Sequence, residues 1–264
     1  MTDAGASQTC SPDAHLVQAP GHWQAIDFVS DLHLCEALPR TFDAFAQHLL
    51  HSTASAVCIL GDLFEVWVGD DMGGRGFELR CVELMAQVSK RKQLAFMVGN
   101  RDFLIGNAFL QQTGCWSLPD PTVIEAWGHR CLLTHGDAWC STDLPYQAFR
   151  RQVRSSAWQS EFLARPLDER LEIAAGIRSA SKSRRQFDGA ADADVDVATA
   201  VACLQDVGAT TLIHGHTHRP SDDLLAPGLQ RHVLTDWDVD QGARAQVLRW
   251  TAAGFARLDP TSSH

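Results

Sequence analysis

Five short apolar runs of this chain are each followed, within three residues, by an aspartate, asparagine or histidine. The runs cover residues 26–29, 56–60, 94–98, 131–133 and 211–213. Short apolar runs rich in valine and isoleucine, with glycine near the exit, predict buried strands. Ligands bind at the carboxyl ends of the strands in open α/β sheets, so we expect all five exits to face one pocket.

The strand exits together supply seven oxygen or nitrogen donors, namely Asp31, His33, Asp62, Asn100, His135, His216 and His218. One metal ion cannot use them all, whereas two ions about 3.5–4 Å apart can, if they share a carboxylate. We assign Asp62 as the shared ligand. One ion would then be completed by Asp31, His33 and His218, and the other by Asn100, His135 and His216. Imidazole and carboxylate without thiolate favour manganese, iron or zinc. His214 lies at the strand end itself, where a supporting role is favoured over ligation.

The charge of the chain excludes some classes of function. With 32 acidic and 22 basic residues, its formal charge is -10, which argues against a broad nucleic-acid surface and therefore against a nuclease. No apolar stretch reaches 18 residues, and the N-terminus lacks the pattern of a signal peptide. We therefore expect no nucleic-acid partner and no membrane-spanning segment.

The order of the segments predicts one α/β domain over residues 22–264, preceded by a disordered tail over residues 1–21. Apolar residues at helical spacing predict amphipathic helices over 39–50 and 77–88, between the strands. His48 and His51 are expected to be solvated residues of the first of these helices.

Residues 144–187 differ in character and are expected to form a helical insert that caps the pocket. Two apolar stripes at helical spacing, 158/162/163 and 167/171/177, lie there among nearly half of the basic residues of the chain. We expect the stripes to line a channel beside the pocket, and Arg150, Arg151, Arg154, Arg184 and Arg185 to face anionic lipid headgroups. The alternative is that the stripes only pack the insert on the core.

The order of the five motifs resembles the calcineurin-like metallophosphoesterases. That resemblance implies a two-sheet β-sandwich flanked by helices, with a dimetal site at one edge. The family commonly has Gly-Asn-His, whereas this chain has Gly99-Asn100-Arg101. An arginine cannot supply a proton near neutral pH, but it binds phosphate well. A diphosphate substrate removes the need for that proton, because its leaving group is already a phosphate.

Longer matches over 60–71, 99–104, 135–137 and 146–150 are similar to one subfamily, the UDP-2,3-diacylglucosamine diphosphatases of lipid A synthesis. The resemblance runs from about residue 25 to residue 250. It implies a metal-dependent diphosphatase with two Mn²⁺ ions, in which an activated water attacks the α-phosphorus of UDP-2,3-diacylglucosamine. The products would be UMP and 2,3-diacylglucosamine 1-phosphate (lipid X). It also implies a peripheral location at the cytoplasmic face of the bacterial inner membrane, in contact with its lipid. No protein partner is evident from the sequence.

The same resemblance implies roles for single residues. The catalytic group would be Asp62, Asn100, Arg101 and His135, and the substrate would be bound by Asn100, Arg101, Asp143, Arg178, Ser181, Arg185 and His216. Asp143 lies in a loop that differs from the family at Ser141 and Thr142, and Ser181 lies in a weaker match over 178–182. Beyond Lys182 the family pattern is not reproduced, and Arg185 and Asp188 occupy the corresponding places.

Two other functions stay open at this point. Another phosphodiesterase or diphosphatase could use the same dimetal fold, although Arg101 and the apolar insert count against it. A scaffold that has lost its metals would lack a ligand, and none of the seven is missing.

Overall fold

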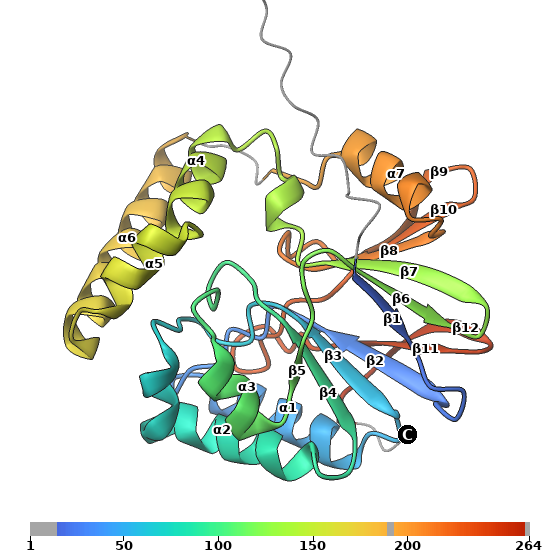
Figure 1. The fold of residues 1–264 in the computed structure, drawn as a ribbon, viewed down its shortest axis with the longest axis horizontal. Coiled ribbons are helices and arrows are strands. Elements are labelled where there is room, and N and C mark those ends of the chain that lie inside the picture. Colours follow the sequence, from blue (N-terminus) through green and yellow to red (C-terminus); the bar gives the residue numbers. More distant parts are fainter. Residues whose placement is uncertain (1–14, 189–192, 262–264) are drawn as a thin grey trace, which may run out of the picture.

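The structure is a computed structural model that describes residues 15–188 and 193–261; over residues 180–188 it describes the backbone only. Two six-stranded sheets face each other and diverge toward one edge (Figure 1). The first sheet has the order β1-β6-β7-β8-β10-β9 and the second β12-β11-β2-β3-β4-β5. The predicted two-sheet sandwich is confirmed.

The second sheet contains three of the predicted metal-site strands side by side. Parallel strands β2 (Ala25–Val29), β3 (Ala56–Leu60), β4 (Gln93–Met97) and β5 (Trp116–Ser117) are extended by the antiparallel pair β11 (Val247–Thr251) and β12 (Gly254–Leu258). The first sheet is built from β1 (His15–Gln18), β6 (Thr122–Ala126), β7 (His129–Thr134), β8 (Thr211–His214), β9 (Ser221–Ala226) and β10 (Leu229–Val233). Parallel pairing of β7 with β8 brings their carboxyl ends to the same edge.

Alternation along the strands explains why the apolar runs are continuous. In β3, Ala56, Cys58 and Leu60 point into the core between the two sheets. Val57 and Ile59 point to the other face, under the helices. Because both faces of this strand are buried, every position is apolar.

Helices cover the outer faces of both sheets (Figure 1). The second sheet is covered by α1 (Pro39–His51), α2 (Gly76–Val88) and α3 (Asn107–Thr113), and the first sheet by α7 (Val197–Asp206). Two short 3₁₀ helices, η1 (Asp70–Gly74) and η2 (Asp137–Trp139), follow strand exits.

Two expectations outside the site are wrong. Residues 15–18 are not part of a tail, because they form the edge strand β1, paired parallel with β6. Residues 1–14 lie outside the described part of the chain. His48 is not solvated: its Nε2 lies 3.3 Å from Oδ2 of the fully buried Asp27, which Arg249 also binds with two nitrogens. His51 is exposed, as predicted.

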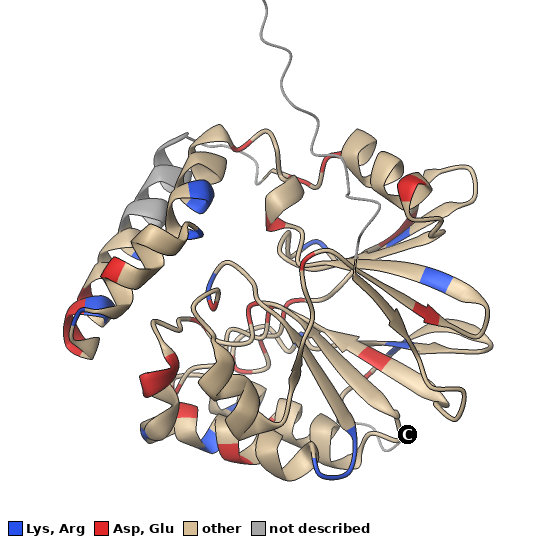
Figure 2. Cartoon of the chain, in the orientation of Figure 1, with Lys and Arg blue, Asp and Glu red and all other residues tan. Residues whose placement is uncertain are grey.

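Residues 144–188 form three helices that lie beside the sheets rather than on them (Figure 1). They are α4 (Leu144–Val153), α5 (Ser156–Leu163) and α6 (Leu167–Asp188), which we call the cap. Both basic and acidic residues lie along the cap (Figure 2). No helix in the described ranges has both the length and the apolar character needed to cross a membrane.

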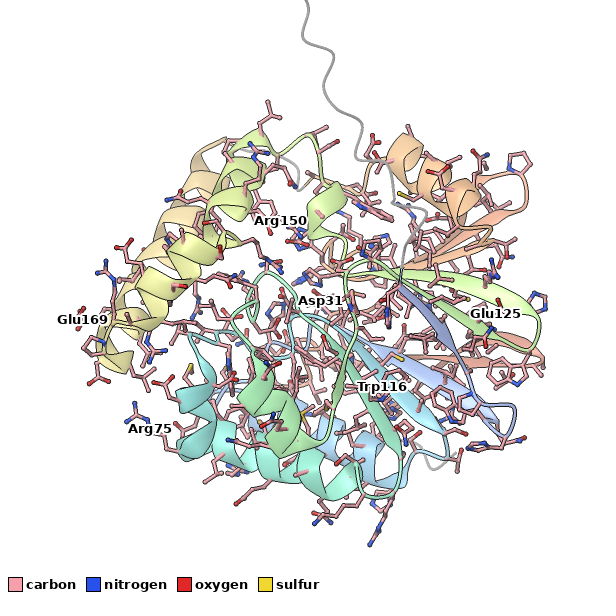
Figure 3. The ribbon with its side chains drawn as sticks, viewed as in Figure 1. Asp31, Arg75, Trp116, Glu125, Arg150 and Glu169 are labelled. Atoms are coloured by element: carbon pink, nitrogen blue, oxygen red, sulfur yellow. The ribbon has the colours of Figure 1, made fainter. Side chains whose placement is uncertain are left out.

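Arginines attach the cap to the sandwich, which corrects part of the expectation for a lipid-facing surface. Arg150 donates from Nε to the buried Asp137 at 2.8 Å, and it lies on the side of α4 that faces the sheets (Figure 3). Arg154 donates to the carbonyl of Gly99 at 2.9 Å. These two therefore face the protein, while Arg151 is exposed. The side chains of residues 184 and 185 lie outside the described part.

Candidate metal centre

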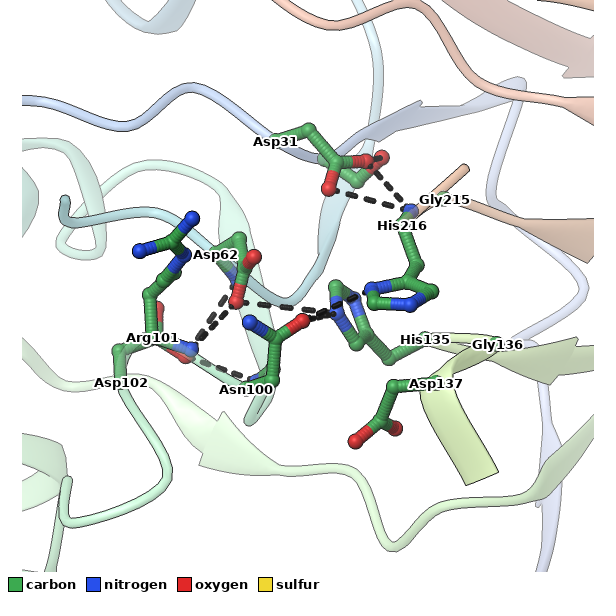
Figure 4. A network of polar contacts seen from close by, with 12 residues as sticks. Asp31, Asp62, Asn100, Arg101, Asp102, His135, Gly136, Asp137, Gly215 and His216 are labelled. Carbon is green, nitrogen blue, oxygen red and sulfur yellow. Dashed lines mark hydrogen bonds and ion pairs between the residues drawn. The ribbon is translucent and has the colours of Figure 1, made fainter. Parts of the chain in front are cut away.

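All seven predicted donors come from loops at the edge where the two sheets diverge. Asp31 and His33 follow β2, Asp62 follows β3 and Asn100 follows β4, all from the second sheet. His135 follows β7, and His216 and His218 follow β8, from the first sheet. The site thus lies between the sheets, with contributions from both (Figure 4).

One set of donors surrounds Asn100. Its Oδ1 lies 2.8 Å from Nδ1 of His216 and 3.1 Å from Nε2 of His135. Nε2 of His135 also lies 3.6 Å from Oδ1 of Asp62. Four atoms that can donate a lone pair therefore converge on a small volume.

A second set surrounds His218. Its Nε2 lies 3.2 Å from Nε2 of His33 and 3.4 Å from Oδ1 of Asp31. Donor atoms of Asp31, His33 and His218 all lie within 4.8 Å of one another, and so do those of Asp31, Asp62 and His135. Two adjacent donor sets fit two cations. Asp31 is common to both of these compact groups, so the assignment of Asp62 as the shared ligand stays a prediction.

The backbone at the donors is unusual. Five of the seven have a positive φ: Asp31 at 53°, His33 at 48°, Asp62 at 53°, His216 at 66° and His218 at 53°. Elsewhere in the described ranges, only Trp127 and Ala243 share this conformation among non-glycine residues. Each such residue costs on the order of 1–3 kcal/mol, and such strain clusters at functional sites. The loops are therefore held in the shape that brings the donors together.

Two glycines permit the close approach of these loops. A Cβ on Gly99 would lie 2.1 Å from Oδ1 of Asp62, and one on Gly215 would lie 2.3 Å from Oδ2 of Asp31. A side chain at either position would displace a carboxylate of the centre. This explains the glycines that the sequence shows beside the donors.

Hydrogen bonds orient the donors for metal binding. Nδ1 of His135 lies 2.8 Å from the carbonyl oxygen of Leu60, so Nδ1 donates, and in the neutral ring the lone pair is on Nε2. Asp31 accepts from the hydroxyl of Ser30 at 2.5 Å and from the backbone N–H of His216 at 2.9 Å. Asp62 accepts from the backbone N–H of Arg101 at 2.8 Å.

The electrostatics of the centre are those of an anionic site. Burial alone would lower the pKa of His135, but the charges of Asp62, Asp137 and Asp31 raise it to about 9. Burial alone would raise the pKa of Asp31, but His218, His135 and His33 hold it below its usual range. The carboxylates thus stay ionised and favour cations, which in metal-free protein include the proton on His135.

Three acidic residues beside the centre have no role assigned from the sequence. Asp102 is fully buried and accepts N–H groups of Gly99 at 2.7 Å and Leu63 at 2.8 Å, which joins two donor loops. Burial and the nearby charge of Asp62 raise its pKa to about 6. Asp137 accepts from Tyr146 Oη at 2.5 Å as well as from Arg150. Glu65 is the third. All three lie inside the motif matches over 60–71, 99–104 and 135–137, and that position is the only sequence signal that could have identified them.

A cavity of about 520 Å³ joins the metal donors to the cap. Its polar wall includes His33, Asp62, Asn100, His216 and His218, and its apolar wall includes Phe103, Phe149, Trp158, Phe162 and Ile177. Of the two predicted stripes, Trp158, Phe162 and Ile177 line the cavity. Phe162 also belongs to the hydrophobic cluster under the second sheet. Trp158, Leu167 and Leu171 pack against this cluster, the two leucines without lining the cavity, and Leu163 is 41% exposed.

The predicted substrate-binding residues also gather at the cavity, where the structure describes them. Its walls include Asn100, Arg101, Asp143, Arg178 and His216. The side chains of Ser181 and Arg185 lie outside the described part. His214 is fully buried, with Nδ1 2.9 Å from the carbonyl oxygen of Gly215.

Comparisons with known proteins agree with this geometry. The model of the calcineurin-like phosphoesterase family matches residues 25–220. UDP-2,3-diacylglucosamine hydrolase of Aromatoleum aromaticum is 42% identical over 86% of this chain and 93% of its own length. The proteins of the same name from Xanthomonas axonopodis pv. citri and Stenotrophomonas maltophilia are each 42% identical, over 86% and 89% of this chain and 95% and 98% of their own lengths. The chain belongs to the calcineurin-like phosphoesterase family and, within it, groups with these hydrolases.

Proposed function

We propose that this chain hydrolyses the diphosphate of UDP-2,3-diacylglucosamine, giving UMP and 2,3-diacylglucosamine 1-phosphate. The observation that carries the proposal is one cavity that has five of the seven predicted metal donors on one wall and apolar residues of the cap on the other. A substrate with a diphosphate and two acyl chains needs both walls. The relatives that carry the name of this activity cover most of the chain.

The donors fit two divalent cations, for which we propose Mn²⁺. Carboxylate, amide and imidazole donors suit manganese, and the described donors include no thiolate. Asp31, His33 and His218 would hold one ion, Asn100, His135 and His216 the other, with Asp62 shared. Two such ions would supply a water of lowered pKa and neutralise charge on the phosphate oxygens.

Side chains of the cavity would bind and orient the diphosphate. Arg101 follows Asn100 directly, and its side chain is 30% exposed into the cavity. Its guanidinium would hold the phosphate and would not donate a proton. We place the attack at the α-phosphorus, so that the sugar phosphate leaves as a stable anion. Arg178, Asp143 and His216 line the same space and would complete the contacts.

The apolar wall would shelter the acyl chains. Trp158 and Phe162 stack with ring centroids 4.6 Å apart, and both line the cavity. Each methylene that such a wall removes from water contributes about 0.8 kcal/mol.

We further propose that the protein meets its substrate at the cytoplasmic face of the inner membrane, as a peripheral protein. Exposed apolar residues on the cap support this: Leu144 is 71% exposed and Leu163 is 41% exposed. Arg151, which is also exposed there, could pair with anionic headgroups.

The test is incubation of purified protein with UDP-2,3-diacylglucosamine and Mn²⁺, followed by detection of UMP. We expect turnover that chelator abolishes and added Mn²⁺ restores. A UDP-sugar without acyl chains and a cyclic nucleotide are tested separately as alternative substrates. Faster hydrolysis of either would show that the chain is another phosphodiesterase or diphosphatase on this fold.

A further inference from the structure

Glu65 lies on the loop between β3 and η1, in a place that the backbone fixes. Its N–H donates to the carbonyl of Leu34 at 3.2 Å. The preceding Phe64 is 1% exposed and packs on Trp67, with ring centroids 4.7 Å apart. The carboxylate is therefore presented from a rigid segment.

The two carboxylate oxygens of Glu65 face different parts of the molecule. Oε2 lies 3.1 Å from Nδ1 of the predicted metal ligand His33. Oε1 accepts from Nη2 of Arg178, on helix α6 of the cap, at 2.5 Å. Nη1 of Arg101 lies 4.0 Å from the same oxygen. One side chain thus joins the metal centre, the cap and the arginine of the Gly-Asn-Arg loop.

The contact with His33 determines which ring nitrogen is free. An ionised carboxylate attracts an N–H group and repels a lone pair, so Oε2 at 3.1 Å favours the neutral tautomer of His33 that carries its proton on Nδ1. Nε2 then keeps its lone pair, and it is Nε2 that lies 3.2 Å from Nε2 of His218. Within the described residues, the buried Nδ1 of His33 makes no hydrogen bond of standard geometry, so the 3.1 Å contact with Glu65 is the polar interaction that this nitrogen has.

We propose that Glu65 is a positioning residue, which fixes the tautomer and ring plane of His33 with one oxygen and holds Arg178 over the cavity with the other. Binding of the cation on the His33 side then depends on Glu65 directly. Seating of the substrate depends on it through Arg178. This inference rests on the proposed dimetal function.

A purely structural role is the rival explanation, in which Glu65 only attaches the cap. The two explanations differ in the metal affinity of substrate-free protein. If Glu65 acts on His33 directly, Glu65→Ala weakens one metal site even without substrate, whereas Arg178→Ala does not. If Glu65 only attaches the cap, both variants affect substrate binding alone.

The experiment is a titration of metal-free protein with Mn²⁺, followed by electron paramagnetic resonance, on wild type and four variants. Glu65→Ala should raise the dissociation constant of one of two ions by about 10–100-fold. Arg178→Ala should leave both constants unchanged and raise KM for the diacylated substrate. Glu65→Gln can still accept from His33 through its amide oxygen, so it should lose no more than about threefold in Mn²⁺ affinity. Glu161→Gln is the matched control, since Glu161 is an exposed cap residue paired only with Arg165 among the described ion pairs.

Unchanged Mn²⁺ affinity in a folded Glu65→Ala protein would overturn the inference while leaving the proposed function intact. Equal loss of Mn²⁺ affinity in Arg178→Ala would also overturn it, because the effect would then come from the cap. Wild-type protein that binds no Mn²⁺ would overturn the proposed function and this inference together. Thermal unfolding of each variant identifies any that has not folded.

Discussion

Ile177 and Leu171 provide a matched pair for testing the acyl-binding wall. Both are half-buried residues of helix α6. Ile177 lines the cavity, whereas Leu171 packs against the core under the second sheet. Fully burying such a side chain contributes about 1.5–3 kcal/mol, so the half that an acyl chain would cover contributes about 0.8–1.5 kcal/mol. Because 1.4 kcal/mol is about a factor of ten, Ile177→Asn should raise KM for the diacylated substrate about four- to twelvefold.

Leu171→Asn should instead lower the free energy of unfolding by about 1–2 kcal/mol and leave KM unchanged. The assay compares UDP-2,3-diacylglucosamine with a UDP-sugar that has no acyl chains, together with chemical denaturation of both variants. Two results would refute the reasoning. One is an Ile177→Asn protein whose kcat/KM falls equally for both substrates, and the other is a Leu171→Asn protein whose KM for the diacylated substrate rises more than that of Ile177→Asn.

Three further predictions concern the centre and its supports. If Asp62 is the shared ligand, Asp62→Asn should lose more activity than Asp31→Asn. The measurement is kcat/KM of both variants at saturating Mn²⁺, and a larger loss in Asp31→Asn would make Asp31 the shared ligand. Tyr146→Phe should cost about 2 kcal/mol in the free energy of unfolding, because its hydroxyl donates to the buried Asp137 carboxylate at 2.5 Å; an unchanged urea midpoint would contradict it. Burial alone would raise the pKa of Asp27, but Arg249 and His48 hold it below its unfolded value of 3.8. The contribution of Asp27 to the free energy of unfolding is therefore present above about pH 4 and is lost as the pH falls below that value. Tm should therefore fall less steeply below pH 4 in Asp27→Asn than in wild type, and parallel curves would count against this.

The gathering of the seven predicted donors at one edge could be predicted from the sequence, because strand exits are local signals. The strands β2, β3 and β4 are buried on both faces, so their apolar runs are nearly continuous, with Asp27 the one buried polar residue, and the donors follow these runs closely. Parallel pairing then places the exits at one edge. Which carboxylate is shared depends on loop shape in three dimensions, and spacing does not contain that information.

The errors have physical reasons. Strand β1 is short and mostly exposed, and pairing with the distant β6 creates it. His48 lies one helical turn after the buried Ala44 and Phe45, so its position is on the buried side of α1, where it faces Asp27 of a neighbouring strand; a histidine is polar, and its residue type alone suggested a solvated position. The charges of Arg150 and Arg154 suggest a lipid surface, yet both lie close to the buried Asp137. The stripe on α6 crosses from the core at Leu171 to the cavity at Ile177, and periodicity alone does not distinguish these two environments.

Hydrolysis of UDP-2,3-diacylglucosamine in ¹⁸O-labelled water, with Mn²⁺ present, tests the central claim most directly. Attack at the α-phosphorus by a water held at the metal centre predicts one ¹⁸O atom in UMP and none in 2,3-diacylglucosamine 1-phosphate, detected by mass spectrometry. Label in the lipid phosphate would contradict the proposed site of attack, and absence of both products would contradict the proposed function.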